Sequence, residues 1–303
     1  MIESPPLPQL LPGQRSRIRI WDRATGTTRT VAESTELQFE APNWTRDDRL
    51  LVNAQGRLWL LPADGSAAPV AIDAPGLPPV NNDHVLAPAG DVVFASANDW
   101  HVWSVPLAGG RPTRLTEEDG ALHFLHGVRP DGERLAYVRL EPEGENWWAS
   151  AKIHTMASTG GDDRAVTDHP GPADGSEWTP DGEWILFNTE QFSTEPGHAQ
   201  LARIREDGTG LEQLTFDERV NWFPHIDPTG EVVAYLSFPP GTTGHPGNLP
   251  VQLRLVTVGA WTEPTTIVEL FGGQGTINVP SWTPDGSAFA FVDYPLETSG
   301  APS

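Results

Sequence analysis

Four side chains of the types that bind divalent metals are scattered along the sequence, and they are the residues best suited to chemistry. They are His84, His126, His225 and Gln274. Neutral imidazole is a ligand that several divalent ions accept, and a carboxamide oxygen can complete such a set. Because their spacing matches no local metal motif, only a fold that gathers distant segments could form the site. We predict that Mn²⁺, Zn²⁺ or Ca²⁺ binds there; histidines that only hydrogen-bond inside the fold are the alternative.

Two residues are candidates for proton transfer. The imidazole of His84 or the carboxylate of Glu177 could take a proton from a ligand whose carbonyl or hydroxyl group a metal polarises. For Glu177 this requires surroundings dry enough to raise its pKa. An ordinary solvated carboxylate is the alternative, since 41 of the 303 residues are Asp or Glu.

Aromatic and amide side chains provide candidates for ligand binding. Trp147 and Trp148 follow the polar run "EGEN" instead of lying in an apolar strand pattern. Rings in such places commonly stack on sugars or on a protein partner, and rings that cap a neighbouring strand are the alternative. The other predicted substrate-binding residues are Asn82, Asn221, Trp222, His245 and Asn278.

The composition narrows the classes of partner. The formal charge of −22 and the lack of a Lys/Arg cluster disfavour nucleic acid and anionic membrane surfaces. No apolar run is long enough to predict a membrane span, and the first residues do not have the pattern of a secretory signal. The chain contains no Cys, which excludes thiolate sites and suits a reducing compartment. We expect a cytoplasmic protein without a nucleic-acid or membrane partner.

A repeated phrase supplies the elements that must position these residues. An apolar or Trp position, a turn resembling Pro-Asp-Gly and an apolar run recur at spacings of 42, 42, 50, 48 and 56 residues. Pro fixes φ at the first corner of such a turn and Gly accepts the positive φ that follows, so the flanking runs form a hairpin. The six copies are "NWTRDDRLLV" from Asn43, "VLAPAGDVVF" from Val85, "GVRPDGERLAYV" from Gly127, "EWTPDGEWILF" from Glu177, "HIDPTGEVVAYL" from His225 and "SWTPDGSAFAFV" from Ser281.

Each full copy continues with two shorter runs, which makes four strands per unit and predicts the blades of a propeller. Residues 17–34 supply a third and a fourth strand without a first and a second, whereas the last copy stops after its second strand. We therefore predict an all-β fold, a six-bladed β-propeller of four-stranded antiparallel blades whose last blade is closed by N- and C-terminal strands. Residues 17–295 form this single domain, between an N-terminal extension at 1–16 and a C-terminal tail at 296–303.

Two of the copies resemble the TolB-like propeller repeat. They are Trp178-Thr-Pro-Asp-Gly182 and Trp282-Thr-Pro-Asp-Gly286, each followed by an apolar strand. The resemblance extends over residues 17–294, although the first two copies keep the turn without its full spelling. It implies the propeller fold but no single activity, because TolB-like propellers include interaction proteins, peptidase domains and relatives of oligogalacturonate lyase. That lyase holds a metal with histidines and a glutamine, and only these ligand types carry over to this chain.

The predicted blades place the candidate residues on one face. If the Pro-Asp-Gly turns lie on one face, the segments before each first strand and the loops after each second strand lie on the other. The three longest of these loops, at 141–151, 190–199 and 239–250, belong to adjacent blades. We expect a site at the channel mouth that binds a small molecule, a neutral or oxidised sugar, with metal-assisted lyase or hydrolase chemistry. A non-catalytic scaffold for a protein or peptide is the alternative.

Overall fold

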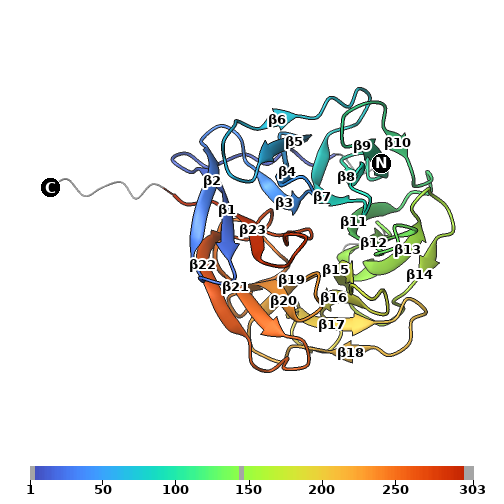
Figure 1. Cartoon of the computed structure of the whole chain (residues 1–303). Helices are drawn as coiled ribbons and strands as arrows, with labels where there is room; N and C mark the ends of the chain where they lie inside the picture. Colours follow the sequence, from blue (N-terminus) through green and yellow to red (C-terminus); the bar gives the residue numbers. More distant parts are fainter. Residues whose placement is uncertain (1–3, 143–146, 297–303) are drawn as a thin grey trace.

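The computed structural model describes residues 4–142 and 147–296, which form a ring of six sheets (Figure 1). Within these residues five sheets have four antiparallel strands that follow one another outward from the centre of the ring. The predicted six-bladed β-propeller is therefore confirmed. Blades are numbered here in the order of the six sequence copies.

Short strands of alternating or wholly buried residues make up the first five blades. Blades 1 and 2 consist of β3 (Glu40–Trp44), β4 (Arg49–Ala54), β5 (Arg57–Pro62) and β6 (Val70–Ala71), then β7 (Val80–Leu86), β8 (Val92–Ala97), β9 (Val102–Pro106) and β10 (Thr113–Arg114). Blade 3 consists of β11 (Leu122–Val128), β12 (Arg134–Leu140), the 3-10 helix η1 (Trp147–Ser150), β13 (Lys152–Ala157) and β14 (Arg164–Ala165). Blades 4 and 5 consist of β15 (Ala173–Trp178), β16 (Ile185–Thr189), β17 (Gln200–Ile204) and β18 (Glu212–Gln213), then β19 (Val220–Ile226), β20 (Val232–Phe238), β21 (Leu249–Thr257) and β22 (Thr265–Gly272).

The two ends of the chain close blade 6, as predicted. Here β1 (Ser16–Asp22) lies between β2 (Thr28–Ser34) and β23 (Ala288–Asp293), so no sheet edge is left open at the junction. Residues 276–283 take the innermost place and run beside β23 through hydrogen bonds such as Ala290 N to Ser281 O at 3.0 Å. Pro280 lies in this segment and has no N–H to donate, which suits an irregular partner better than a regular strand.

The Pro-Asp-Gly turns have the backbone that the sequence predicts. The glycine that ends the turn has φ of 72–82° in blades 2 to 6, a region that residues with a Cβ rarely adopt. In blade 1 Asp48 takes this place with φ of 62°. Each turn therefore reverses the chain between the first and second strand of its blade.

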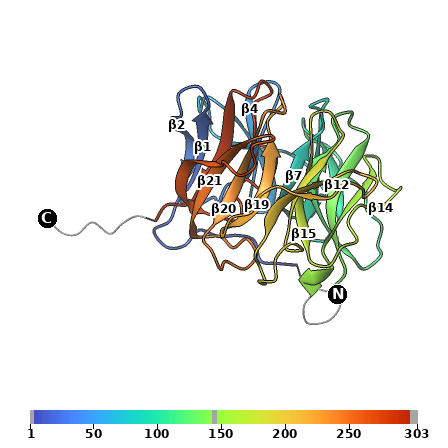
Figure 2. The same ribbon diagram turned by 90° about the horizontal axis from the view of Figure 1, so that it is seen from below.

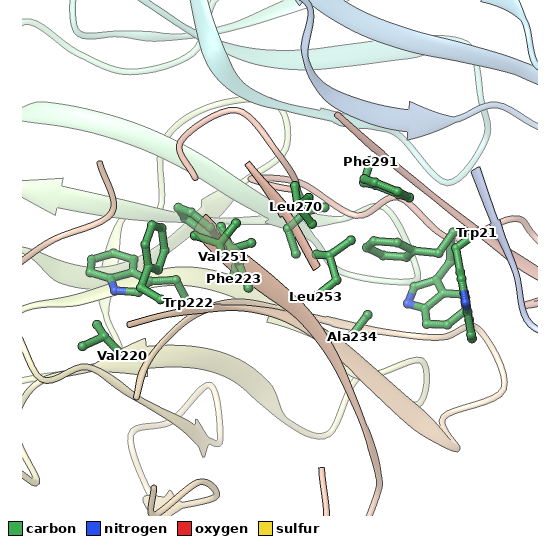
Figure 3. Packing of buried hydrophobic residues seen from close by; sticks show 14 of the residues in the cluster. Trp21, Val220, Trp222, Phe223, Ala234, Val251, Leu253, Leu270 and Phe291 are labelled. Atoms are coloured by element: carbon green, nitrogen blue, oxygen red, sulfur yellow. The ribbon is translucent and has the colours of Figure 1, made fainter. Parts of the chain in front are cut away.

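Apolar side chains fill the spaces between neighbouring blades. Figure 3 shows the cluster between blades 5 and 6, to which Trp21, Phe223 and Leu253 belong. In the same cluster Trp282 meets Phe289 edge to face with ring centroids 5.0 Å apart. Trp178 and Trp282 are buried and Trp44 is half-buried, so the tryptophans of the repeat belong to the core. Burying a large apolar side chain contributes roughly 1.5–3 kcal/mol, and these contacts fix the blades against one another.

The innermost strands of blades 1 to 5 share an irregularity. In each, the pairing with the second strand shifts register, for example between Glu40 and Asn43 in β3 and between Trp222 and His225 in β19. The residues between are bulged out of the ladder, which turns side chains away from the sheet. The sequence predicted that the polar residues before each turn phrase lie ahead of the first strands. In the structure they lie inside these strands, at the bulges.

The two faces of the ring differ. The Pro-Asp-Gly turns lie on one face, and the N-terminal segment and η1 lie together on the other (Figure 2). In residues 4–142 and 147–296 there is no helix long and apolar enough to cross a membrane.

Candidate functional site

A cavity of about 340 Å³ opens where the innermost strands begin, and side chains from all six blades line it. Its polar wall contains Glu40, Asn82, Asp83, His126, Asp174 and Asn278. Its aromatic wall contains Trp100, Phe124, Trp147, Trp148 and Phe223. Ligand sites in proteins combine apolar walls with a few convergent polar groups, so this mouth cavity is the candidate site.

A larger cavity of about 640 Å³ lies on the turn face between blades 1 and 6. Its charged residues, such as Arg46, Asp48 and Asp285, are exposed members of the turns. Exposed charges are solvated and bind a ligand weakly. The mouth cavity is the better candidate because its three carboxyl groups and the imidazole of His126 are buried.

The strand bulges aim side chains into the mouth cavity. Asp83 and His126 both lie inside the register shifts of their strands. Phe223 lies in the equivalent shift of β19 with φ of 54°, which costs a bulky residue about 1–3 kcal/mol and persists only where neighbours enforce it. One such neighbour is Asn188, whose Oδ1 accepts a hydrogen bond of 3.1 Å from the Phe223 backbone N–H.

An imidazole between two carboxylates forms the electrostatic centre of the cavity. His126 Nε2 lies 2.7 Å from Asp174 Oδ1, and its Nδ1 donates to the Asn278 carbonyl at 3.2 Å. Burial acts to lower the pKa of His126, but Asp174 and Asp83 outweigh it and raise the pKa well above its ordinary value. For the carboxyl groups burial acts in the opposite direction and raises the pKa of Asp83. Burial also acts to raise the pKa of Asp174, but the paired His126 outweighs it and lowers that pKa. At neutral pH the arrangement therefore favours an imidazolium paired with Asp174.

Glu40 is a second buried carboxyl group in the wall. Its Oε2 accepts a hydrogen bond of 2.8 Å from the Asn53 carboxamide, and its Oε1 one of 3.4 Å from Asn82. Burial nevertheless dominates and raises the pKa of Glu40 to about 7. This group can therefore gain or lose a proton near neutral pH.

Two predicted residues from distant segments meet at the rim. His245, from the loop between β20 and β21, hydrogen-bonds through Nδ1 to Gln274 Oε1, and Gln274 Nε2 donates to Asn82 Oδ1 at 3.1 Å. His245 Nε2 lies 3.7 Å from Asp174 Oδ2. Burial lowers the pKa of His245, which favours its neutral form at neutral pH.

The aromatic wall has a fixed arrangement. Trp147 and Trp148 come from η1, and Trp147 is 40% exposed, so one ring remains accessible from solvent. Trp222 is buried behind the wall, stacked on Trp148 with ring centroids 6.1 Å apart and against His245 at 4.3 Å. The wall is therefore supported by a second aromatic layer, which limits how far its rings can move.

The N-terminal extension covers part of the cavity. Pro5, Pro6 and Pro8 line it, and the Ser4 hydroxyl donates to the Asn98 carbonyl at 2.7 Å. The sequence offered no periodic signal for this contact, because the segment precedes the first blade strand.

The predicted metal ligands do not form one ready ligand set. His84 lies outside the cavity wall, with ring nitrogens 2.9 Å from Asn43 Oδ1 and 3.3 Å from Asn53 Oδ1, and burial lowers its pKa to about 3. The ring of His225 hydrogen-bonds to Glu177 Oε2 at 2.6 Å and to the Ile277 carbonyl. Both nitrogens of all three predicted histidines thus have other partners. Among residues 4–142 and 147–296 no three His, Cys, Asp or Glu are arranged to hold a metal ion.

The structure divides the predicted site residues into two groups. Those that line the mouth cavity are Asn82, His126, Trp147, Trp148, His245, Gln274 and Asn278. Those that lie elsewhere are His84, Glu177, Asn221, Trp222 and His225. Asn221, for example, is buried and hydrogen-bonds to Ser237 and Asp217. Glu177 hydrogen-bonds to His225, and burial raises the pKa of Glu177.

The site also contains residues that the sequence prediction did not select. Glu40 precedes the first copy where other copies carry polar residues such as Asp83 and Asp174, so position in the repeat could have identified it. Phe223 and Trp100 carry no such signal, because their places depend on positive φ values within the folded chain.

Comparisons with known proteins agree with this architecture. No family model matches the chain. An uncharacterized protein of Agrobacterium fabrum, Atu1656, is 35% identical in an alignment of 291 positions that covers 93% of this chain and 94% of that protein. A solved structure from Agrobacterium tumefaciens, assigned as a TolB candidate, has a TM-score of 0.84 and 32% identity, and the match covers 93% of this chain and 98% of that one. A manganese-bound oligogalacturonate lyase has a TM-score of 0.59 at 14% identity, covering 94% and 78% of the two chains, a likeness of fold alone.

Proposed function

We propose, because this chain belongs to the family of TolB-like six-bladed propellers, that it uses its channel mouth to bind a small polyhydroxylated molecule such as a neutral sugar. The observation that carries the proposal is the mouth cavity itself. Its aromatic rings offer faces to the C–H surface of a sugar, and its carboxyl and amide groups offer acceptors and donors to hydroxyl groups.

A neutral ligand fits this cavity better than an oxidised one. Three carboxyl groups lie in the wall, and none of the described lining residues is Arg or Lys. The carboxylate of an oxidised sugar would therefore enter a cavity with no basic residue other than His126 and His245, and His126 is already paired with Asp174.

Proton transfer to or from the bound molecule is a second step of the proposal. Burial raises the pKa of Glu40 to about 7, so this group is a candidate to exchange a proton with a ligand hydroxyl. Lyase or hydrolase activity with His84 or Glu177 as the catalytic group is less favoured, because neither lines the cavity.

The divalent metal stays a prediction. Binding at the predicted set would require His84, His126 and His225 to exchange their present hydrogen bonds for the ion. Elemental analysis of the purified protein tests it. Stoichiometric Mn or Zn, together with a higher Tm when the ion is added back, would establish a metal site. Absence of both the bound metal and the rise in Tm would contradict it.

Calorimetric titration with glucose, galactose and cellobiose tests the function. We expect saturable binding of at least one sugar, with affinity reduced at least tenfold in Trp147→Ala. Phe216→Ala is the matched control, because Phe216 is an exposed aromatic residue outside the cavity. No saturable binding of any of the three, or equal losses in the two variants, would contradict the proposal.

A protein or peptide partner is the alternative. In that case no sugar would bind, and the aromatic wall would be the contact surface. A cytoplasmic location and the exclusion of nucleic acid and membranes as partners also stay predictions from composition.

A further inference from the structure

The mouth cavity has more acidic than basic groups. Glu40, Asp83 and Asp174 contribute three carboxyl groups, and the ion-paired His126 contributes one cation. The other imidazole of the wall, His245, donates through Nδ1 to Gln274 and lies 3.7 Å from Asp174 Oδ2, beyond hydrogen-bond distance. The hydroxyl groups of a neutral ligand would leave this excess of negative charge uncompensated.

The two carboxylate oxygens of Asp174, which lines the cavity, differ in their contacts. Asp174 Oδ1 is the atom that contacts His126 Nε2 at 2.7 Å, and it also accepts a hydrogen bond of 2.6 Å from the Gly175 backbone. Among the described residues, Asp174 Oδ2 has only the longer approach to His245. Because the bulge of β15 fixes the strand at this point, Oδ2 keeps its place as an acceptor for a donor on the ligand.

The carboxamide of Asn278 is already used within the wall. Asn278 is 1% exposed, and its Oδ1 accepts a hydrogen bond of 2.8 Å from the Gly275 backbone. Hydrogen bonding from its side chain acts to lower the pKa of Asp83, against the stronger effect of burial. Asp174 Oδ2 therefore stays the acceptor for a donor on the ligand.

The aromatic wall suits a positive charge. Trp rings attract cations over their faces, and the effect grows when water is excluded. Trp148 belongs to the wall and packs near His245 with ring centroids 6.3 Å apart. Carboxylates and aromatic faces together are the combination that holds organic ammonium groups in proteins.

We infer that the ligand of the mouth cavity carries an ammonium group as well as hydroxyl groups, as an amino sugar does. The ammonium group donates to Asp174 Oδ2 and lies against the aromatic wall. This inference rests on the proposed function and specifies the class of its ligand.

Calorimetric titration with glucosamine, N-acetylglucosamine and glucose tests the inference, because these three differ at one substituent. We expect glucosamine to bind at least tenfold more tightly than either neutral sugar at neutral pH. Asp174→Asn should remove this preference, so that the ratio of the two affinities approaches one. Since Asp174 also pairs with His126, Asp83→Asn serves as a second variant, with a smaller loss of preference expected.

Asp168→Asn is the control for the loss of one negative charge, because Asp168 is exposed and lies outside the cavity. It should leave the ratio of the affinities unchanged. Equal affinities for glucosamine and glucose would overturn the inference and leave the proposed function intact. Absence of binding by all three sugars would overturn both.

Discussion

Replacing Glu40 by Gln should change how the stability of the protein depends on pH. The pKa of this buried carboxyl group is raised from 4.5 to about 7 in the folded protein. Between these values the unfolded chain releases the proton and the folded protein keeps it, so the free energy of unfolding falls as pH rises. Each pKa unit corresponds to about 1.4 kcal/mol, so the group loses about 3 kcal/mol of stability between pH 4.5 and 7.

Glu40→Gln removes this titration. The substitution leaves a neutral amide near Asn53 and Asn82, and any mismatch of donors costs the same at every pH. The wild type should therefore lose about 3 kcal/mol relative to the variant as pH rises from below 4.5 to above 7, and the difference should then stay constant.

Urea unfolding at a series of pH values measures the difference. Other buried titrating groups are present in both proteins and largely cancel. Glu36→Gln is the control, since Glu36 is exposed four residues earlier, and its profile should follow that of the wild type. A difference between wild type and Glu40→Gln that does not change with pH would refute the assignment of Glu40 as a buried carboxyl group of the cavity wall.

Three further predictions concern the site and its support. In Asp174→Asn the pKa of His126 should fall by about 1–3 pKa units, because its ion-pair partner is neutralised; a histidine NMR titration, assigned with His126→Gln, measures it, and an unchanged pKa would argue against the pair. Deleting residues 1–9 removes three prolines from the cavity wall, so ligand association and dissociation should both be faster in stopped-flow fluorescence; unchanged rates would show that the segment does not cover the site. Phe289→Ala should cost about 3–5 kcal/mol in urea unfolding, because Phe289 is fully buried between blades, whereas Phe216→Ala should change stability by less than about 0.5 kcal/mol; similar losses would contradict the assigned core.

The fold could be predicted from the sequence because its determinants are local and repeated. Six copies of a turn phrase set the number of blades, and the incomplete units at the two ends indicated how the ring closes. The positive φ of Gly182 and Gly286 in the structure follows from the same turn chemistry that the sequence displayed.

The site could be predicted only in part. Position within the repeat identified the face and the segments, and seven of the twelve selected residues line the cavity. The direction of each side chain depends on the strand bulges, which arise from pairing between strands and leave no local mark in the sequence. His84 and His126 occupy similar places before a Pro-containing turn, yet only His126 reaches the cavity wall, since His84 lies deeper between Asn43 and Asn53.

A crystal structure with bound glucosamine tests the central claim most directly, because it locates the ligand. We predict density in the mouth cavity, with the ammonium group within hydrogen-bond distance of Asp174 Oδ2 and the sugar ring against the aromatic wall. Density in the larger cavity on the turn face, or an empty mouth in a crystal grown at saturating glucosamine, would contradict it.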